Sequence, residues 1–129
     1  MSFLFDTDVL VDHLRGVAGA RDALLTLGGG SDPGAISVIT VAEIEAGLRE
    51  EERPAVERLF AALAIQDVTE PIARQAGRYR ASFGASHGVL LPDAIIAATA
   101  HVQQMQLVTL NKKHYPMSDI VVQVPYRRE

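Results

Sequence analysis

The chain has 129 residues, of which 48% are hydrophobic and 22% are charged, a balance typical of one globular domain of ordinary size. Cysteine is absent, which excludes disulfide bonds and thiolate metal sites. The net charge is −4, which argues against passive binding of nucleic acid. The charge is also uneven: residues 1–70 hold 13 acids and 5 Lys or Arg, whereas residues 71–129 hold 3 acids and 7 Lys or Arg.

The N-terminal segment is not expected to be a signal peptide, because Asp6 and Asp8 interrupt its apolar run and no basic residue precedes them. No stretch of the sequence reaches the roughly 18 uninterrupted apolar residues that a membrane span needs. We therefore expect a soluble, cytoplasmic protein that forms a single domain over residues 1–129 and does not bind a membrane.

Short apolar runs alternate with helical patterns along the chain. In chain order, the patterns predict a strand at 2–5, helices at 8–14 and 17–27, a strand at 35–39, helices at 40–49 and 54–64, a strand at 65–68, helices at 71–83 and 92–105, and strands at 107–110 and 120–124. This alternation predicts an α/β fold in three layers, with a parallel sheet of four to five strands flanked by helices. In such a sheet the functional site lies beyond the carboxyl ends of the strands.

Asp6 directly follows the first predicted strand, so we expect it at the carboxyl end of that strand. A charged residue at this place is costly unless it is paired or bound to a cation. Either Asp6 or Asp8 could instead cap the helix that follows. We assign the cap to Asp8, which leaves Asp6 as the functional candidate.

Two further acids are predicted in first helical turns. Glu43 stands three residues after Thr40, as in a capping box, and this structural role explains it well by itself. Asp93 follows Pro92 in an apolar, alanine-rich segment, where the helix dipole would stabilise an acid. No Lys or Arg occurs at 81–111 to pair with Asp93, so the buried helix predicted there would need another partner for this carboxylate.

A parallel sheet directs Asp6, Glu43 and Asp93 to the same edge, where three carboxylates would repel one another. A hard cation such as Mg²⁺ or Mn²⁺ removes this repulsion because it prefers oxygen ligands. The three acids therefore predict a metal site that activates water and stabilises charge on a phosphoryl group. The uneven charge fits an acidic, cation-binding end beside a basic end that meets phosphates, although a solvated helix end at residues 50–52 explains it equally well.

Four segments resemble the motifs of the PIN-domain ribonucleases, and among them those of the VapC-type toxins of bacterial toxin–antitoxin pairs. These segments are FDTDVL at 5–10, TVAEIEAG at 40–47, LPDAIIAATA at 91–100 and VTLNKKHY at 108–115. Their order and spacing resemble the family across essentially the whole chain, and the third segment is the most specific.

The resemblance implies a PIN-like fold and a metal-dependent endoribonuclease that uses Mg²⁺ or Mn²⁺. It also implies a homodimer and a VapB-type antitoxin that blocks the site. It makes Asp6, Glu43 and Asp93 the catalytic and metal-binding residues and places Thr109 and Asn111 next to them. Family members often have a fourth acid where this chain has Asn111, whose amide oxygen can still bind a metal or water but adds no charge.

Three alternatives stay open from the sequence. A phosphatase of the haloacid-dehalogenase type would use Asp6 as the nucleophile and Asp8 as the acid/base, but the chain is short for that fold. A receiver domain would need a phosphoacceptor at the end of a strand, and Asp67 is predicted inside its strand. A non-catalytic RNA- or protein-binding PIN-like module has only Asn111 in its favour.

Several surfaces are expected to meet partners. The apolar faces of the helices predicted at 17–27 and 54–64 suit a dimer contact, and the antitoxin is expected to lie across the acidic cleft with an Arg against its carboxylates. His114, which follows two lysines, could meet RNA or lie in a solvated loop. Arg127 and Arg128 could contact RNA phosphates or belong to a frayed tail.

Overall fold

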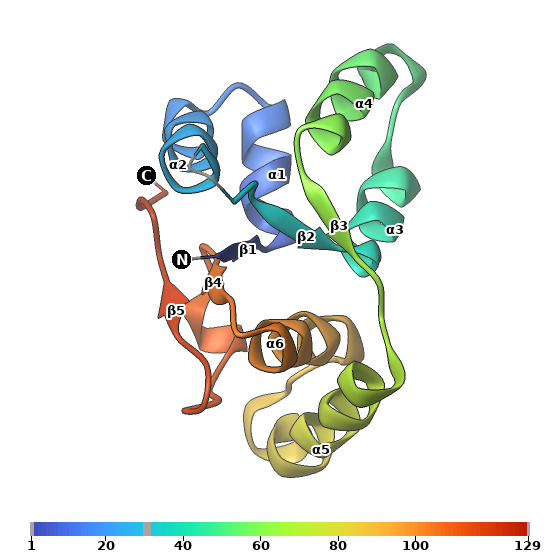
Figure 1. Ribbon diagram of the computed structural model, residues 1–129, viewed down its shortest axis with the longest axis vertical. Helices are drawn as coiled ribbons and strands as arrows, with labels where there is room; N and C mark the ends of the chain where they lie inside the picture. Colours follow the sequence, from blue (N-terminus) through green and yellow to red (C-terminus); the bar gives the residue numbers. More distant parts are fainter. Residues whose placement is uncertain (1, 30–31, 129) are drawn as a thin grey trace.

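The computed structural model of the protein describes residues 2–29 and 32–128 (Figure 1). The elements in chain order are β1 (Phe3–Phe5), α1 (Thr7–Leu14), α2 (Ala18–Gly28), β2 (Ala35–Ser37), α3 (Val38–Gly47), the 3₁₀ helix η1 (Glu50–Glu52), α4 (Arg53–Ala61), β3 (Ala64–Gln66), α5 (Glu70–His87), α6 (Leu91–Gln103), β4 (Gln106–Val108), the 3₁₀ helix η2 (Lys112–His114) and β5 (Val122–Gln123). None of the helices in the described part of the chain combines the length and the apolar character needed to cross a membrane.

The five strands form one parallel sheet in the order β3-β2-β1-β4-β5, with β1 in the centre. Leu4 of β1 pairs with Ala35 of β2 on one side and with Leu107 of β4 on the other. Successive side chains of a strand point to opposite faces of the sheet, so Leu4 and Phe5 belong to two different cores. The predicted parallel sheet of four to five strands is confirmed.

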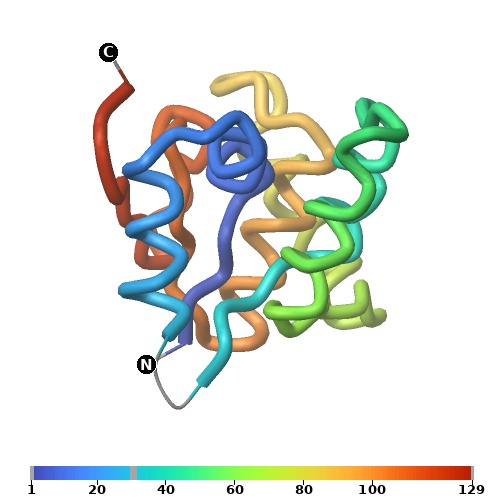
Figure 2. Tube along the Cα trace, turned by 90° about the horizontal axis from the view of Figure 1, so that it is seen from above, coloured from blue at the N-terminus to red at the C-terminus, as the bar shows by residue number. Residues whose placement is uncertain are grey.

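Helices cover both faces of this sheet (Figures 1 and 2). On one face, α1, α2, α3 and α4 pack around Phe5, Ile36 and Val108. On the other face, α5 and α6 pack around Leu4 and Leu107. The predicted three-layer α/β sandwich is therefore confirmed, and burial on both faces explains why the central strand β1 is wholly apolar.

The start of α3 differs from the prediction because of a side chain that caps the helix. Ser37 Oγ accepts a hydrogen bond of 3.1 Å from the Ile39 amide, so α3 begins at Val38. The capping box predicted for Thr40 and Glu43 is therefore wrong. Thr40 is fully buried inside the helix, and Glu43 is left to make contacts elsewhere.

Two further boundaries were predicted wrongly. Helix α5 continues through Gly84, and the chain reverses at Gly88, whose φ of +64° is in the left-handed region that glycine adopts without steric cost. Strand β3 ends before Asp67, so this residue does not lie inside the strand as predicted. Asp67 is exposed beside an edge strand of the sheet.

Candidate active site

Asp6 lies where β1 ends and α1 begins, at the middle of the carboxyl edge of the sheet. Its Oδ1 accepts a hydrogen bond of 2.8 Å from the Thr7 amide, so Asp6 caps α1 and the assignment of this cap to Asp8 is wrong. Its Oδ2 accepts hydrogen bonds of 2.8 Å from the hydroxyls of Thr109 and Tyr115. Because only 6% of Asp6 is exposed, these donors replace the water that a free carboxylate would bind.

Tyr115 connects Asp6 with Asp93. Its hydroxyl lies 2.8 Å from Asp6 Oδ2 and 3.5 Å from Asp93 Oδ1. Burial and the charges of these two acids raise the pKa of Tyr115 far above its usual value, so the phenol stays a hydrogen-bond donor. Sequence reasoning missed Tyr115, whose one signal was its position at the end of the fourth motif-like segment.

Glu43 reaches the same edge from α3 through Thr7. The Thr7 hydroxyl donates a hydrogen bond of 2.7 Å to Glu43 Oε1 and lies 2.9 Å from the Thr40 hydroxyl. The Thr7 amide meanwhile donates to Asp6. The first residue of α1 therefore holds two of the three predicted acids, and Tyr115 holds the third.

The three acids also interact through their charges. Burial raises the pKa of Asp93, and the negative charges of Asp6 and Glu43 raise it further, whereas nearby His114 lowers it. The Nδ1 atom of His114 lies 3.4 Å from Asp93 Oδ2. In the described part of the chain, no Lys or Arg forms an ion pair with any of the three acids. The edge of the sheet therefore carries negative charge that a bound cation would neutralise.

Carboxylate oxygens are the ligands that Mg²⁺ and Mn²⁺ prefer, so the chemistry of this donor set fits a hard divalent ion. Among the described residues, no group of three or more acidic or histidine side chains is arranged so that it could hold a metal ion. The carboxylates of Asp6, Glu43 and Asp93 are held instead by the hydroxyls of Thr7 and Tyr115. An ion would therefore bind to lone pairs of these carboxylates that the hydroxyl contacts leave free.

Asp8 ties the start of α1 to the loop that follows β4. Its Oδ2 accepts hydrogen bonds of 3.0 Å from the Leu110 amide and 3.2 Å from Asn111 Nδ2, and lies 3.3 Å from Thr109 Oγ1. Burial and, after it, the charge of Asp6 raise the pKa of Asp8 to about 6. Thr109 therefore contacts both acids, while Asn111 reaches the site through Asp8.

Two other acids, Asp12 and Asp119, take part in structural contacts away from this edge. The C-terminal segment is not a frayed tail, because Arg128 Nη2 lies 2.8 Å from Asp12 Oδ1 and the Tyr126 hydroxyl donates to Asp12 Oδ2 at 2.8 Å. Asp119 lies in a turn before β5 and accepts a hydrogen bond of 2.8 Å from the Tyr79 hydroxyl.

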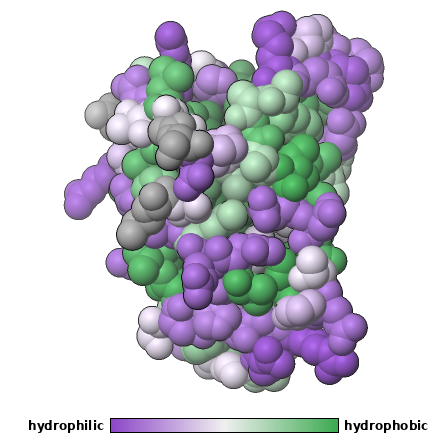
Figure 3. All heavy atoms as spheres, viewed as in Figure 1, coloured by the Kyte–Doolittle hydropathy of each residue, from purple (hydrophilic) through white to green (hydrophobic). Residues whose placement is uncertain are grey.

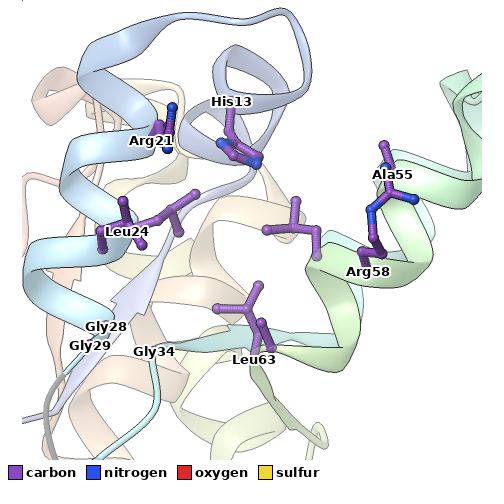
Figure 4. Close-up of a pocket in the computed structure, with 12 residues that line it drawn as sticks. His13, Arg21, Leu24, Gly28, Gly29, Gly34, Ala55, Arg58 and Leu63 are labelled. Carbon is purple, nitrogen blue, oxygen red and sulfur yellow. The ribbon is translucent and has the colours of Figure 1, made fainter.

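A separate groove of about 400 Å³ lies between α2 and α4 (Figure 4). Arg21 of α2 and Arg58 of α4 flank it, and His13 of α1 also lines it. Four leucines line its apolar part: Leu24, Leu25, Leu59 and Leu63. Figure 3 shows apolar side chains gathered in the half of the molecule that contains these helices, bordered by hydrophilic residues. The two helices that were predicted to have apolar outer faces thus form the walls of one groove.

Comparisons with known proteins agree with this fold and site. A family model described as PIN domain matches residues 3–119, and the chain belongs to this family. Ribonuclease VapC10 of Mycobacterium tuberculosis is 49% identical over 115 residues, which cover 88% of this chain and 86% of that protein. Ribonuclease VapC19 of the same organism is 42% identical over 115 residues, which cover 88% of this chain and 92% of that protein.

A solved structure described as a toxin–antitoxin complex from Klebsiella pneumoniae contains a similar chain. That chain is 29% identical, with a TM-score of 0.81 over 98% of this chain and 100% of its own length. The resemblance to PIN-domain proteins of the VapC type is therefore confirmed. The haloacid-dehalogenase and receiver-domain alternatives are wrong, while the roles of Asp6, Glu43 and Asp93 stay a prediction.

Proposed function

We propose that this protein is an endoribonuclease that depends on Mg²⁺ or Mn²⁺ and acts as the toxin of a toxin–antitoxin pair. The observation that carries the proposal is the placement of three acids at one edge of the sheet: the Tyr115 hydroxyl contacts Asp6 and Asp93, and Thr7 contacts Asp6 and Glu43. None of the three acids pairs with a Lys or Arg in the described part of the chain. The relatives named ribonucleases, at 49% and 42% identity, support RNA as the substrate.

In this proposal Asp6 and Asp93 bind the ion directly and Glu43 acts directly or through a bound water. The ion would supply an activated water and would stabilise the charge that develops on the phosphate. The protein's own contribution is to fix the ligands before the ion arrives. Thr109 and Tyr115 hold one oxygen of Asp6, so this carboxylate cannot rotate freely.

Cleavage by purified protein tests the proposal. We expect cleavage of structured RNA with Mg²⁺ or Mn²⁺ and its loss when EDTA removes the metal. Asp93→Asn keeps the shape of the side chain but removes one charge, and should lower the rate by more than about 100-fold, beyond the range for residues that only support a ligand. Asp119→Asn is the matched control and should cleave normally.

A different result would favour the non-catalytic module. If the antitoxin-free protein cleaves no RNA with either metal while its three acids are intact, the proposal is wrong. Equal cleavage by Asp93→Asn and the unchanged protein would contradict the assignment of this acid, since a residue that only stabilises a helix dipole contributes about 0.3–1 kcal/mol to stability and nothing to activity.

We further propose a VapB-type antitoxin as the partner, docked in the groove between α2 and α4. The apolar walls suit one face of an amphipathic helix, and Arg21 and Arg58 suit acidic side chains beside that face. The toxin–antitoxin complex of the Klebsiella relative supports a partner of this kind. An Arg of the antitoxin against the acidic residues of the cleft stays part of the proposal.

Co-expression with the small neighbouring reading frame tests the partner. Arg21→Glu combined with Arg58→Glu should release the antitoxin without changing cleavage by the free protein, and Arg74→Glu combined with Arg78→Glu is the control with the same charge change. Retention of the antitoxin by the first double variant would place its docking site elsewhere.

We also propose that the protein forms a homodimer, which light scattering on the protein separated from its antitoxin would measure. We propose a cytoplasmic location, which cell fractionation would measure.

A further inference from the structure

A second groove, of about 550 Å³, opens directly beside the acidic residues. His87 at the end of α5 and Lys112 and Lys113 of η2 line one part of it, and Tyr115 lines it as well. Tyr115 also contacts Asp6 and Asp93 through its hydroxyl, so a single side chain belongs both to this groove and to the candidate active site.

Positive charge is concentrated in this groove. Lys112 and Lys113 are the two lysines of the chain, and both are exposed. Neither forms an ion pair with an acid in the described part of the chain, and no acid lines the groove. Arg53, in contrast, lies between Glu45 and two further acids, and Arg128 is held by Asp12.

The acidic site needs such a neighbour if it acts on RNA. Its carboxylates repel a polyanion, so a substrate must be drawn in by positive charge next to the reacting phosphate. The 3₁₀ helix that carries the two lysines also carries His114, whose ring lies 3.4 Å from Asp93. A phosphate on one side of the reacting phosphate would therefore come within reach of the flexible lysine side chains.

We propose that the groove formed by His87, Lys112 and Lys113 holds the RNA backbone on one side of the cleaved bond. This inference rests on the proposed ribonuclease function. No Phe or Trp lines the groove and Tyr115 is buried, so the contact rests mainly on charge and is independent of base sequence.

Another groove of the molecule provides a matched control. It has a volume of about 650 Å³ and contains Arg74, Arg78 and His101, the same number of basic side chains. It lies by the far end of α6, since His101 is eight residues and about 12 Å along the helix from Asp93. Its charge is also reduced, because Arg74 pairs with Glu70 at 2.8 Å.

The test measures binding of a labelled single-stranded RNA by fluorescence anisotropy, with Asp93→Asn present in every variant to prevent cleavage. Lys112→Ala combined with Lys113→Ala should weaken binding and should lower the slope of log affinity against log salt by about 1.4, since each phosphate contact on a single strand contributes about 0.7. Arg74→Ala combined with Arg78→Ala should change neither quantity. Lys112→Arg combined with Lys113→Arg should keep the affinity and the slope.

If the two double alanine variants lose the same amount of RNA affinity, binding depends only on the overall charge of the protein, and the proposal is overturned. Unchanged RNA affinity in Lys112→Ala combined with Lys113→Ala would overturn it as well. With Asp93 intact, the lysine pair should raise KM and leave kcat nearly unchanged. Failure of the unchanged protein to cleave RNA concerns the proposed function alone, because the binding comparison does not depend on turnover.

Discussion

The hydroxyl of Tyr115 donates a hydrogen bond of 2.8 Å to Asp6, across a sequence separation of 109 residues. This contact brings the last motif-like segment of the chain onto the first. The same hydroxyl lies 3.5 Å from Asp93, so the tyrosine lies between two acids that would otherwise repel each other at short range. Its position makes the tyrosine a support for the ligands of the proposed metal site.

Tyr115→Phe is expected to reduce both metal affinity and cleavage. The buried carboxylate of Asp6 loses one of its donors, which should lower the free energy of unfolding by about 1–3 kcal/mol. Looser ligands should weaken Mn²⁺ binding, measured by calorimetry, by about 10–100-fold. Tyr79→Phe is the control, because this hydroxyl donates to Asp119 at 2.8 Å and lies away from the acidic residues. If Tyr115→Phe binds Mn²⁺ as tightly as the unchanged protein, the tyrosine does not support the site.

Glu43→Gln and Glu45→Gln should behave differently although both residues are in α3. Glu43 faces Thr7 and the acidic edge, whereas Glu45 pairs with Arg53 at 3.2 Å on the surface. Glu43→Gln should slow RNA cleavage by at least about 10-fold, as expected when a group that orients or binds a metal is lost. Glu45→Gln should leave the rate unchanged and alter stability by less than about 1 kcal/mol. Equal rates for the two variants would return Glu43 to a structural role.

The stability of the metal-free protein should fall as pH rises from about 4 to about 6, because of Asp8. Its pKa in the folded protein is about 6 instead of 3.8, so between these values the folded protein binds more protons than the unfolded chain. The contribution of Asp8 to the free energy of unfolding is therefore fully present below pH 3.8 and is lost as pH rises through about 6. Urea unfolding in the presence of EDTA measures the free energy of unfolding at each pH. In Asp8→Asn this free energy should vary less between about pH 4 and about pH 6. An unchanged pH profile in Asp8→Asn would contradict the prediction.

Asn111→Asp should destabilise the protein, since it would place a carboxylate where an amide now donates to Asp8 at 3.2 Å. The double variant Asp8→Asn with Asn111→Asp exchanges the two groups and should recover much of the loss. The coupling energy from the four free energies of unfolding should be about 0.5–3 kcal/mol in favour of the exchanged pair. Asn111→Ala is the control that removes the hydrogen bond without adding charge. Additive effects would show that the two side chains do not interact.

The fold class could be predicted from the sequence because periodicity and the alternation of short apolar runs with helical patterns are local properties. Parallel strands buried on both faces leave a clear signal in runs such as residues 3–5. The PIN-domain match over residues 3–119 includes all four motif-like segments. Asp6 and Asp93 could also be placed, since the end of a strand and the first turn of a helix are visible in the chain itself.

Capping roles could not be predicted, because several side chains could satisfy the same backbone amide. Asp8 and Thr40 were assigned caps that belong to Asp6 and Ser37. The choice depends on which side chain has a better partner elsewhere. Asp8 accepts from the loop after β4, a segment more than 100 residues away in the chain.

Only the tertiary structure decided which hydroxyls surround the acids. Thr7 contacts Glu43 across 36 residues, and Tyr115 contacts Asp6 across 109. No periodic pattern encodes such pairs, since they arise when the central strands of the sheet bring the ends of distant segments to one edge. The sequence by itself determined the acids and the family motifs, and the packing of helices on both sides of β1 determined how those acids are held.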